Sequence, residues 1–198
     1  MVGGCSLIIL AGGRSRRMGQ DKAMLAAGHE TMVERLVHRL KPVVDEVIVA
    51  GGASPSPMSG ATVVADAYTD AGPLAGMHAG FLATACARAW VVACDLPDVE
   101  PALGPWLLRV AAGVDAVVPR LGDEPQGVCA IYDIRLAPRL EGLLASGKRR
   151  VTDLLDVCAV RYVEAAELQA VDPELRSFRN LNTPADYVAW VRSRPAPR

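Results

Sequence analysis

Short apolar runs alternate with longer amphipathic or alanine-rich segments, and this alternation constrains the possible folds more than any other feature. Strand-like runs occupy residues 6–11, 47–50, 62–64, 90–93, 116–118, 128–132 and 161–163. Helix-like segments occupy residues 31–40, 74–89, 101–112, 136–145 and 183–192. Such alternation predicts a mostly parallel sheet with helices on both faces. The expected fold is therefore α/β, a Rossmann-like three-layer sandwich with a mostly parallel central sheet.

Three of the expected helices carry signals for their N-termini. Thr31 and Glu34 have the spacing of a capping box, in which each residue caps the backbone of the other. Thr183 is expected as an N-cap with a proline directly after it, where proline is favoured. Asp98 is the expected N-cap of the helix over residues 101–112.

Length and charge exclude several classes of protein. The 198 residues suit one domain over residues 1–198, with residues 194–198 expected as a flexible tail. The net charge of −1 gives no overall field that would attract nucleic acid or a membrane. No apolar run approaches the ~20 residues of a membrane span, and the first residues lack the pattern of a signal peptide. A cytoplasmic protein is therefore expected, without nucleic-acid or membrane partners.

The cysteines do not indicate a cross-linked or zinc-binding protein. Five are scattered along the chain, and no C-x-x-C motif occurs. Most lie in apolar runs and are expected to be small core residues, including Cys94.

The segment from Leu10 to Lys22, LAGGRSRRMGQDK, carries the strongest chemical signal. Adjacent glycines at 12 and 13 let the backbone turn and approach a ligand closely. Four basic residues then face a single acidic one: Arg14, Arg16, Arg17 and Lys22 against Asp21. Backbone N–H groups and clustered cations suit a polyphosphate, so this loop after the first strand predicts a nucleotide site.

The loop does not match the two commonest phosphate-binding motifs. A Walker A motif needs G-x-x-x-x-G-K-[ST], whereas five residues separate Gly13 from Gly19 and Gln20 follows. The adjacent glycines also exclude G-x-G-x-x-G. A P-loop kinase and an ordinary dinucleotide-binding enzyme are thus disfavoured. A solvated basic turn is the alternative for a bare Gly-Gly-Arg, but the full run favours a ligand site.

Two carboxylates follow other strands of the expected sheet. Ligands of open α/β sheets bind beyond the carboxyl ends of the strands, which makes these positions informative. Asp95 comes directly after an apolar strand and is favoured as a Mg²⁺ ligand, because carboxylates hold the Mg²⁺ that bridges phosphate oxygens. Asp66 follows the run over residues 62–64 and is equally consistent with a ligand contact or a turn.

Two polar clusters later in the chain stay open to two interpretations. Lys148, Arg149 and Arg150 follow Gly147, a helix C-cap, and form either a solvated helix end or a site for a second phosphate. Asn180 and Asn182 are either turn residues or amides that contact a polar ligand. The three histidines form no cluster, and no pattern supports a covalent enzyme intermediate.

The ordered motifs resemble those of the MobA-type nucleotidyltransferases, and among them the molybdenum cofactor guanylyltransferases. The first motif, Leu10 to Gly13 with Arg17-Met18-Gly19 and Asp21-Lys22, marks the superfamily. Four further segments agree in order: Asp66 with Gly72-Pro73-Leu74-Ala75-Gly76, Cys94-Asp95-Leu96-Pro97, Gly147-Lys148-Arg149-Arg150-Val151 and Asn180-Leu181-Asn182-Thr183-Pro184. Together they span nearly the whole chain.

The resemblance implies transfer of GMP from MgGTP to the phosphate of molybdopterin, with release of pyrophosphate. By analogy, Leu10, Ala11, Gly12 and Gly13 contact the nucleotide and Asp66 the nucleoside, while Asp95 holds Mg²⁺. Arg17 and Lys22 would neutralise the triphosphate. The implied acceptor residues are Lys148, Arg149, Asn180 and Asn182. GTP and molybdopterin are then the small-molecule partners, beside other proteins of cofactor biosynthesis.

One departure leaves the choice of nucleotide open. The family tends to carry an asparagine after its second strand, but here Ala50 is followed by Gly51-Gly52-Ala53. Gly12-Gly13 still favours GTP over CTP. The alternatives are a related transferase that uses CTP or a sugar-phosphate acceptor, and a non-catalytic nucleotide-binding module.

Overall fold

The computed structural model describes residues 4–12, 30–51, 58–68 and 71–193. The strands of this part of the chain are β1 (Cys5–Leu10), β2 (Glu46–Ala50), β3 (Thr62–Val64), β4 (Arg88–Ala93), β5 (Ala116–Leu121), β6 (Glu124–Pro125), β7 (Cys129–Asp133) and β8 (Val160–Glu164). Its α-helices are α1 (Met32–Leu40), α2 (Pro73–Ala83), α3 (Leu103–Arg109), α4 (Ala137–Ala145), α5 (Val151–Leu155), α6 (Ala165–Leu168) and α7 (Pro184–Ser193). Short 3₁₀ turns follow α1, precede α4 and precede α7.

The strands form one mixed, mostly parallel sheet. Their order is β3-β2-β1-β4-β7-β5-β6, and β8 pairs with β5. β1, β2, β3 and β4 run parallel to one another, as do β5 and β8, whereas β7 and β6 are antiparallel to their neighbours. All six residues of β1 are buried, as expected of a central strand with both faces covered.

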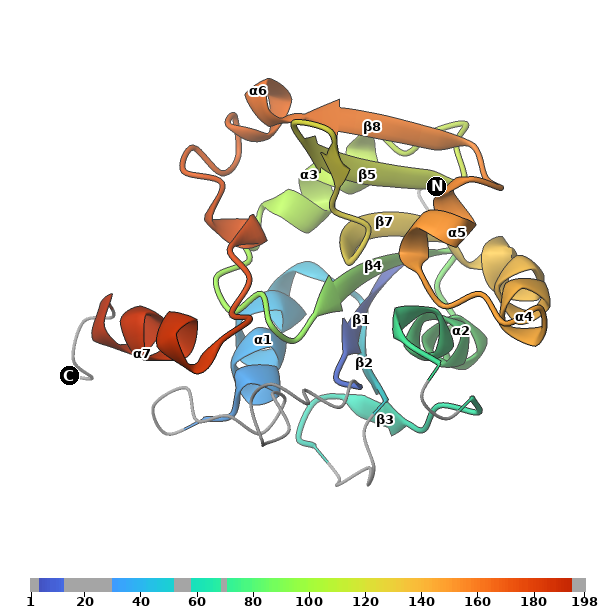
Figure 1. Ribbon diagram of the computed structural model, residues 1–198, viewed down its shortest axis with the longest axis horizontal. Coiled ribbons are helices and arrows are strands. Elements are labelled where there is room, and N and C mark those ends of the chain that lie inside the picture. The colour runs from blue at the N-terminus through green and yellow to red at the C-terminus, as the bar shows by residue number, and fades with distance from the viewer. Residues whose placement is uncertain (1–3, 13–29, 52–57, 69–70, 194–198) are drawn as a thin grey trace.

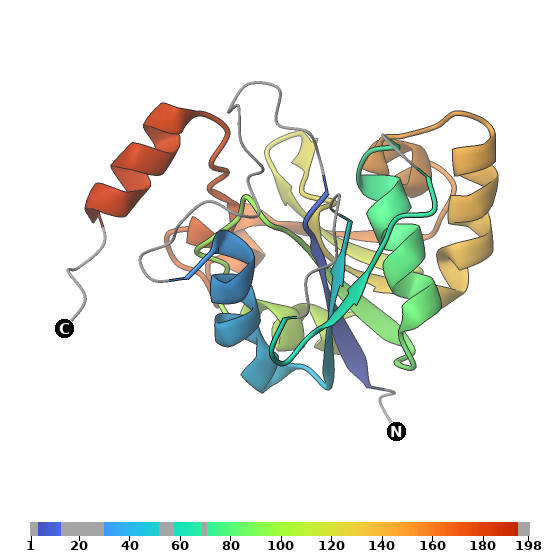
Figure 2. The ribbon, with the colours of Figure 1, turned by 90° about the horizontal axis from the view of Figure 1, so that it is seen from below.

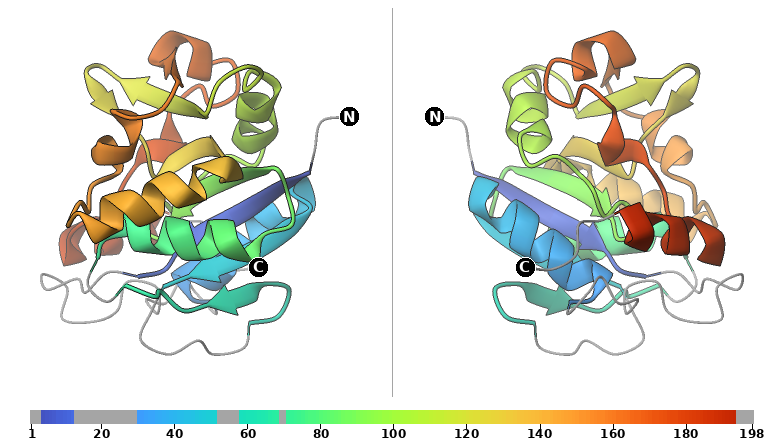
Figure 3. Two further views of the ribbon diagram at one scale, coloured as in Figure 1. Left: turned by 90° about the vertical axis from the view of Figure 1, so that its right-hand side faces the viewer. Right: turned by 90° about the vertical axis from the view of Figure 1, so that its left-hand side faces the viewer.

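Helices cover the sheet on both faces, which confirms the predicted three-layer sandwich. α1 and α3 share one core cluster with residues of the sheet, and α2, α4 and α5 share a second cluster on the opposite face. Figure 1 shows α1 and α2 on the two sides of the central strands, and Figure 3 shows each face in turn, with α2 beside α4 on one and α1 on the other. The two faces of the sheet are therefore covered, and the carboxyl ends of the parallel strands β1 to β4 lie along one edge.

Glycines let α2 lie unusually close to β1. A Cβ on Gly80 would lie 2.7 Å from two carbons of Ile8, and a Cβ on Gly76 would lie 3.0 Å from Leu10 Cδ2. The first separation is shorter than real Cβ contacts, so a side chain at position 80 would displace Ile8, and a side chain at position 76 would press against Leu10. The N-terminus of α2 is thereby held at the carboxyl end of β1.

Local sequence signals set several helix ends as predicted. Thr31 Oγ1 accepts a hydrogen bond from Glu34 N at 3.2 Å, and Glu34 Oε2 accepts one from Thr31 N at 2.7 Å, which confirms the capping box. At α7, Thr183 Oγ1 accepts from Asp186 N at 3.1 Å, which confirms Thr183 as the N-cap. Gly147 has a φ of +82°, the left-handed conformation of a residue that ends a helix.

Other predicted boundaries were wrong. α2 ends at Ala83 rather than at residue 89, and β4 already begins at Arg88. Arg88 belongs to the strand because its backbone pairs with Cys5 of β1 and Asp133 of β7, and its guanidinium lies 3.6 Å from the buried Asp133 carboxylate. Asp98 is not the N-cap of α3: that helix follows Ala102 and has no side-chain cap.

No helix in the described ranges is both long and apolar enough to cross a membrane.

A candidate nucleotide site at the carboxyl edge of the sheet

The carboxyl ends of β1 and its two parallel neighbours are joined edge to edge by backbone hydrogen bonds. Ala11 N donates to Ala50 O at 2.8 Å, and Cys94 N donates to Leu10 O at 3.1 Å. The ladder thus continues past the last residue of each strand, so the segments after β1, β2 and β4 leave the sheet side by side. In Figure 2 this edge faces upwards, with α7 on one side of β1 and α5 on the other.

Gly12 and Gly51 approach each other more closely than residues with side chains could. Gly51 has a φ of +90°, and a Cβ there would lie 2.8 Å from both Cα and N of Gly12 and 3.2 Å from Asp66 Oδ2. Of the predicted nucleotide residues, Leu10 and Ala11 are buried while Gly12 is exposed. The structure therefore brings Gly12 and Asp66 together, with Gly51 between them.

Asp66 carries a carboxylate that the described protein groups do not satisfy. Its Oδ1 is buried and accepts no hydrogen bond from the described residues, and burial raises the pKa of this carboxyl above its ordinary value. The same oxygen lies 3.7 Å from the Cβ position of Gly76. A buried anion without donors is costly unless a ligand supplies them, which favours a ligand contact over a turn for Asp66.

Asp95 and the two asparagines, which are far apart in the sequence, are joined through the backbone. Leu181 N, between Asn180 and Asn182, donates to Asp95 O at 2.9 Å. Asn182 N also donates to Asp186 Oδ2 at 3.0 Å, so the first turn of α7 orients this segment. Both asparagines are exposed and Asp95 is partly exposed, which leaves the three side chains accessible to a ligand.

The basic turn of residues 147–150 lies against the start of α2. A Cβ on Gly72, whose φ is +69°, would lie 2.9 Å from Arg149 O. Asp153 organises this turn: its Oδ2 accepts from Arg149 N at 3.3 Å and from Arg150 N at 3.0 Å, and its Oδ1 lies 3.2 Å from Lys148 Nζ. These donors hold the pKa of Asp153 below its ordinary value, the Arg150 N–H contributing most. Lys148 and Arg149 thus sit at the edge where α2 begins.

Sequence reasoning did not assign Gly51 or Asp153 to the site, and it expected Asp98 only as a helix cap. Asp153 could have been found from its spacing, since it lies three residues after Arg150 as a capping-box acid does. Gly51 was noted only because it lies where the family tends to carry an asparagine. Its close approach to Gly12 was not predictable from sequence, because it depends on the pairing of β1 with β2. The contacts of Asp98 involve residues distant in sequence and left no local signal.

Three predicted residues, Gly13, Arg17 and Lys22, lie outside the described residues. Their roles rest on the sequence alone.

No group of three or more histidine, cysteine or acidic side chains is placed to hold a metal within the described ranges. Asp95 is the candidate ligand at the end of β4. One carboxylate is consistent with Mg²⁺, which often takes one or two protein carboxylates and completes its shell with phosphate oxygens and water. The uncompensated carboxylate of Asp66 at the same edge also fits a site that receives a cation together with its nucleotide.

The remaining reactive side chains have structural surroundings. Cys94 is buried in the core cluster shared with α1, as predicted. His38 is exposed, and its Nδ1 lies 2.9 Å from Glu30 Oε1. His78 is buried on α2 with its ring edge-on to Tyr68, at 5.8 Å between ring centroids.

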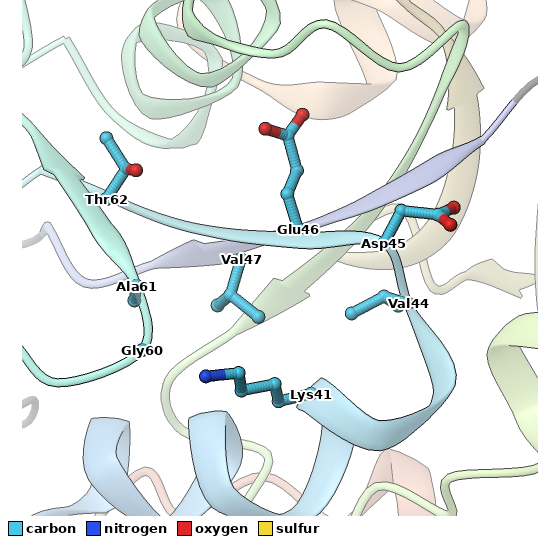
Figure 4. A pocket seen from close by; sticks show the side chains of 8 residues that line it. All are labelled: Lys41, Val44, Asp45, Glu46, Val47, Gly60, Ala61 and Thr62. Atoms are coloured by element: carbon cyan, nitrogen blue, oxygen red, sulfur yellow. The ribbon is translucent and has the colours of Figure 1, made fainter.

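A cavity of about 390 Å³ lies at the other edge of the sheet, near the amino ends of β2 and β3. Figure 4 shows its lining, with the Lys41 side chain extending towards Gly60. Both of its acids already have partners: Asp45 accepts from Cys5 N at 2.7 Å, and Glu46 accepts from Ala85 N at 3.1 Å. The cavity is therefore separate from the polar residues at the carboxyl edge.

The fold and the residues at its carboxyl edge define a nucleotidyltransferase: residues 7–164 match the family described as the MobA-like NTP transferase domain, and the chain belongs to this family. This confirms the resemblance seen in the motifs. Individual relatives within the family narrow the comparison to one named activity. A protein of Pelotomaculum thermopropionicum named probable molybdenum cofactor guanylyltransferase is 40% identical over 182 residues, covering 91% of this chain and 89% of that protein.

Two further relatives agree. A protein of Methanosarcina mazei with the same name is 36% identical over 195 residues, covering 91% of this chain and 87% of its own length. The crystal structure of molybdopterin-guanine dinucleotide biosynthesis protein A from Archaeoglobus fulgidus superposes with a TM-score of 0.81 at 26% identity, covering 94% of this chain and 97% of that one.

Proposed function

We propose that this nucleotidyltransferase transfers GMP from MgGTP to the terminal phosphate of molybdopterin, releases pyrophosphate and forms the guanine dinucleotide cofactor. The observation that carries the proposal is the convergence, at one edge of the sheet, of motifs dispersed along the chain. Gly12, Gly51 and Asp66 meet there, as do Asp95 and Leu181. The names of the relatives supply the identity of the two substrates.

The nucleotide half of the proposed site comprises Leu10, Ala11, Gly12, Gly13 and Asp66. Glycine at position 12 exposes backbone to the ligand, and the close approach of Gly51 leaves no side chain between Gly12 and Asp66. In the proposal the Asp66 carboxylate accepts hydrogen bonds from the nucleoside, which supplies the donors that its buried oxygen lacks. Arg17 and Lys22 neutralise the triphosphate, a role proposed from the sequence.

Asp95 is the proposed Mg²⁺ ligand. When bound, Mg²⁺ lowers the repulsion between the acceptor and the triphosphate and stabilises charge on the leaving pyrophosphate. The Asp95 carboxylate, after the end of β4, would hold the ion, and the hydrogen bond from Leu181 N to Asp95 O fixes the backbone of the same residue.

The acceptor half comprises Lys148, Arg149, Asn180 and Asn182. The two basic side chains would bind the phosphate of molybdopterin, and the two amides would contact the polar edges of the pterin. The basic pair lies in the turn before α5 and the asparagine pair in the segment before α7, so the two pairs would contact an acceptor from different sides.

The reaction needs positioning and charge neutralisation rather than covalent help from the protein. An oxygen of the acceptor phosphate attacks the α-phosphorus of GTP, a new P–O bond forms, and the bond to the β-phosphate oxygen breaks. Pyrophosphate leaves with the electron pair. Because the attacking phosphate is already anionic, no general base is required.

The proposal includes a cytoplasmic setting and one domain over residues 1–198. It also includes other cofactor-biosynthesis proteins as the source of molybdopterin.

The test is an assay of the purified protein with Mg²⁺ and molybdopterin, with GTP, CTP, ATP or UTP as the donor. We expect a dinucleotide product from GTP and little from the others; a preference for CTP, or no product, would contradict the proposal.

Asp95→Asn is expected to lower turnover about 10³-fold, because a metal ligand contributes several kcal/mol to transition-state stabilisation. Asp123→Asn, at an exposed turn between β5 and β6, is the matched control and is expected to retain full activity.

A further inference from the structure

α7 packs against the body of the protein mainly through Trp190, with the partly buried Tyr187 beside it. Trp190 is 7% exposed, the only buried residue of this helix, whereas Val188 and Val191 are more than 40% exposed. In Figures 1 and 2, α7 projects away from the sheet on the side of α1. Trp190 is therefore the main anchor of α7, and its contacts matter for where the helix lies.

Trp190 contacts one charged pair from two other segments. Its Nε1–H donates to Asp98 Oδ2 at 2.7 Å, and its ring lies under the guanidinium of Arg35, 5.5 Å from the ring centroid. Arg35 in turn donates to Asp98 Oδ1 at 3.3 Å and to Pro97 O at 3.2 Å. Both oxygens of Asp98 are thus engaged, one by α1 and the other by α7. We call Arg35, Asp98 and Trp190 the Asp98 cluster.

The Asp98 cluster is connected to the segment of residues 180–182 in two ways. Asp98 is three residues past Asp95, and the Leu181 N–H bonds to Asp95 O. Leu181 and Trp190 also share a small apolar cluster with Met32 of α1. The segment of residues 180–182 is therefore held by Asp95 through the backbone of Leu181 and by Trp190 through the side chain of Leu181, and Trp190 itself is bound to Asp98.

We propose that Arg35, Asp98 and Trp190 are positioning residues for the acceptor substrate, acting through Asn180 and Asn182. None of the three touches a substrate in this proposal. Their polar contacts are directional, so they set the distance and rotation of α7 relative to β4 more narrowly than apolar packing alone. The inference rests on the proposed function, because it concerns binding of the acceptor to these asparagines.

The variant that tests this is Trp190→Phe, which keeps an aromatic ring and removes the indole N–H. A hydrogen bond to a charged group is strong enough that its loss should raise the KM for molybdopterin about tenfold. The KM for GTP should change less than about twofold, because Gly12, Gly51 and Asp66 lie on other elements. Val188→Thr, isosteric and exposed on the same helix, is the control and should leave both constants unchanged.

The hydrogen-exchange rate of the Leu181 backbone N–H is a second test that does not depend on catalysis. Trp190→Phe should speed this exchange relative to the wild type and to Val188→Thr, while exchange in β1 and β4 stays the same. An unchanged KM for molybdopterin, or an unchanged exchange rate at Leu181, would overturn the positioning role. If the wild-type protein makes no dinucleotide, that result contradicts the proposed function, and the proposed positioning role is contradicted with it.

Discussion

Because Gly51 has no Cβ, it can lie close to Gly12 at the carboxyl edge of the sheet. Its φ of +90° is in the region that favours glycine, and its backbone lies against Gly12 at a distance that no larger residue permits. Gly113 has a similar φ of +77° but has nothing within 4 Å of its Cβ position. Substitution of Gly113 therefore measures the effect of the backbone conformation alone, whereas substitution of Gly51 adds the effect of the close contact with Gly12.

Gly51→Ala is expected to impair nucleotide binding, whereas Gly113→Ala is not. Both should lose about 1–2 kcal/mol of unfolding free energy from the left-handed conformation, measured by urea denaturation. Gly51→Ala should lose more, and its KM for GTP should rise about tenfold or more because the added methyl displaces Gly12. Equal KM values for GTP in the two variants would show that the approach to Gly12 has no role in the site.

Single residues also show where prediction from sequence works. The Thr31–Glu34 capping box was predictable because both partners lie within one turn of helix. Asp98 has its partners 63 and 92 residues away, in α1 and α7, so its sequence context suggested a helix cap instead. The oxygen of Asp66 left without a partner is likewise a consequence of burial that no local pattern reveals.

Among the elements, the basic turn before α5 depends on one acid. Asp153 accepts two backbone N–H groups and pairs with Lys148, and it thereby shapes the loop that is proposed to bind the acceptor phosphate. α5 has five residues and α6 four, too short for apolar periodicity to predict them. The end of α2 was missed for a different reason: the alanine-rich segment past Ala83 has the composition of a helix, although the chain leaves the helix there and continues into β4.

Asp153→Asn is expected to raise the KM for molybdopterin about fivefold and to leave the KM for GTP unchanged, since an amide cannot replace the ion pair and holds the turn less firmly. Because the pKa of Asp153 is lowered in the folded protein, the carboxylate stabilises the fold above its unfolded pKa. That contribution is lost as the pH falls through the lowered value, so the stability difference between wild type and Asp153→Asn should shrink in acid. Asp156→Asn, exposed at the other end of α5, is the matched control; an equal effect of this variant on KM would contradict the role of Asp153.

Across the whole molecule, the parallel arrangement of β1 to β4 explains why the motifs converge. Each of these strands ends at the same edge, so the segments after them meet without any motif being near another in sequence. The alternation of strands and helices was sufficient to predict this edge. It did not reveal that α5 and α7 approach the edge from opposite sides of β1, because that depends on tertiary contacts at Gly72, Asp98 and Trp190 (Figure 2).

The two sides are expected to act on the acceptor independently. Asp153 contacts the turn of residues 148–150, whereas Trp190 contacts Asp98 and Arg35. In the double variant Asp153→Asn with Trp190→Phe, the increases in the KM for molybdopterin should therefore multiply, with a coupling free energy within about 0.5 kcal/mol of zero. Trp190→Phe and Asp98→Ala each remove the same hydrogen bond, one its donor and the other its acceptor, so the effects of that pair should fall well short of multiplication. Steady-state kinetics of the single and double variants at saturating GTP measure both cycles, and strong coupling between Asp153 and Trp190 would mean that the two sides form one cooperative unit.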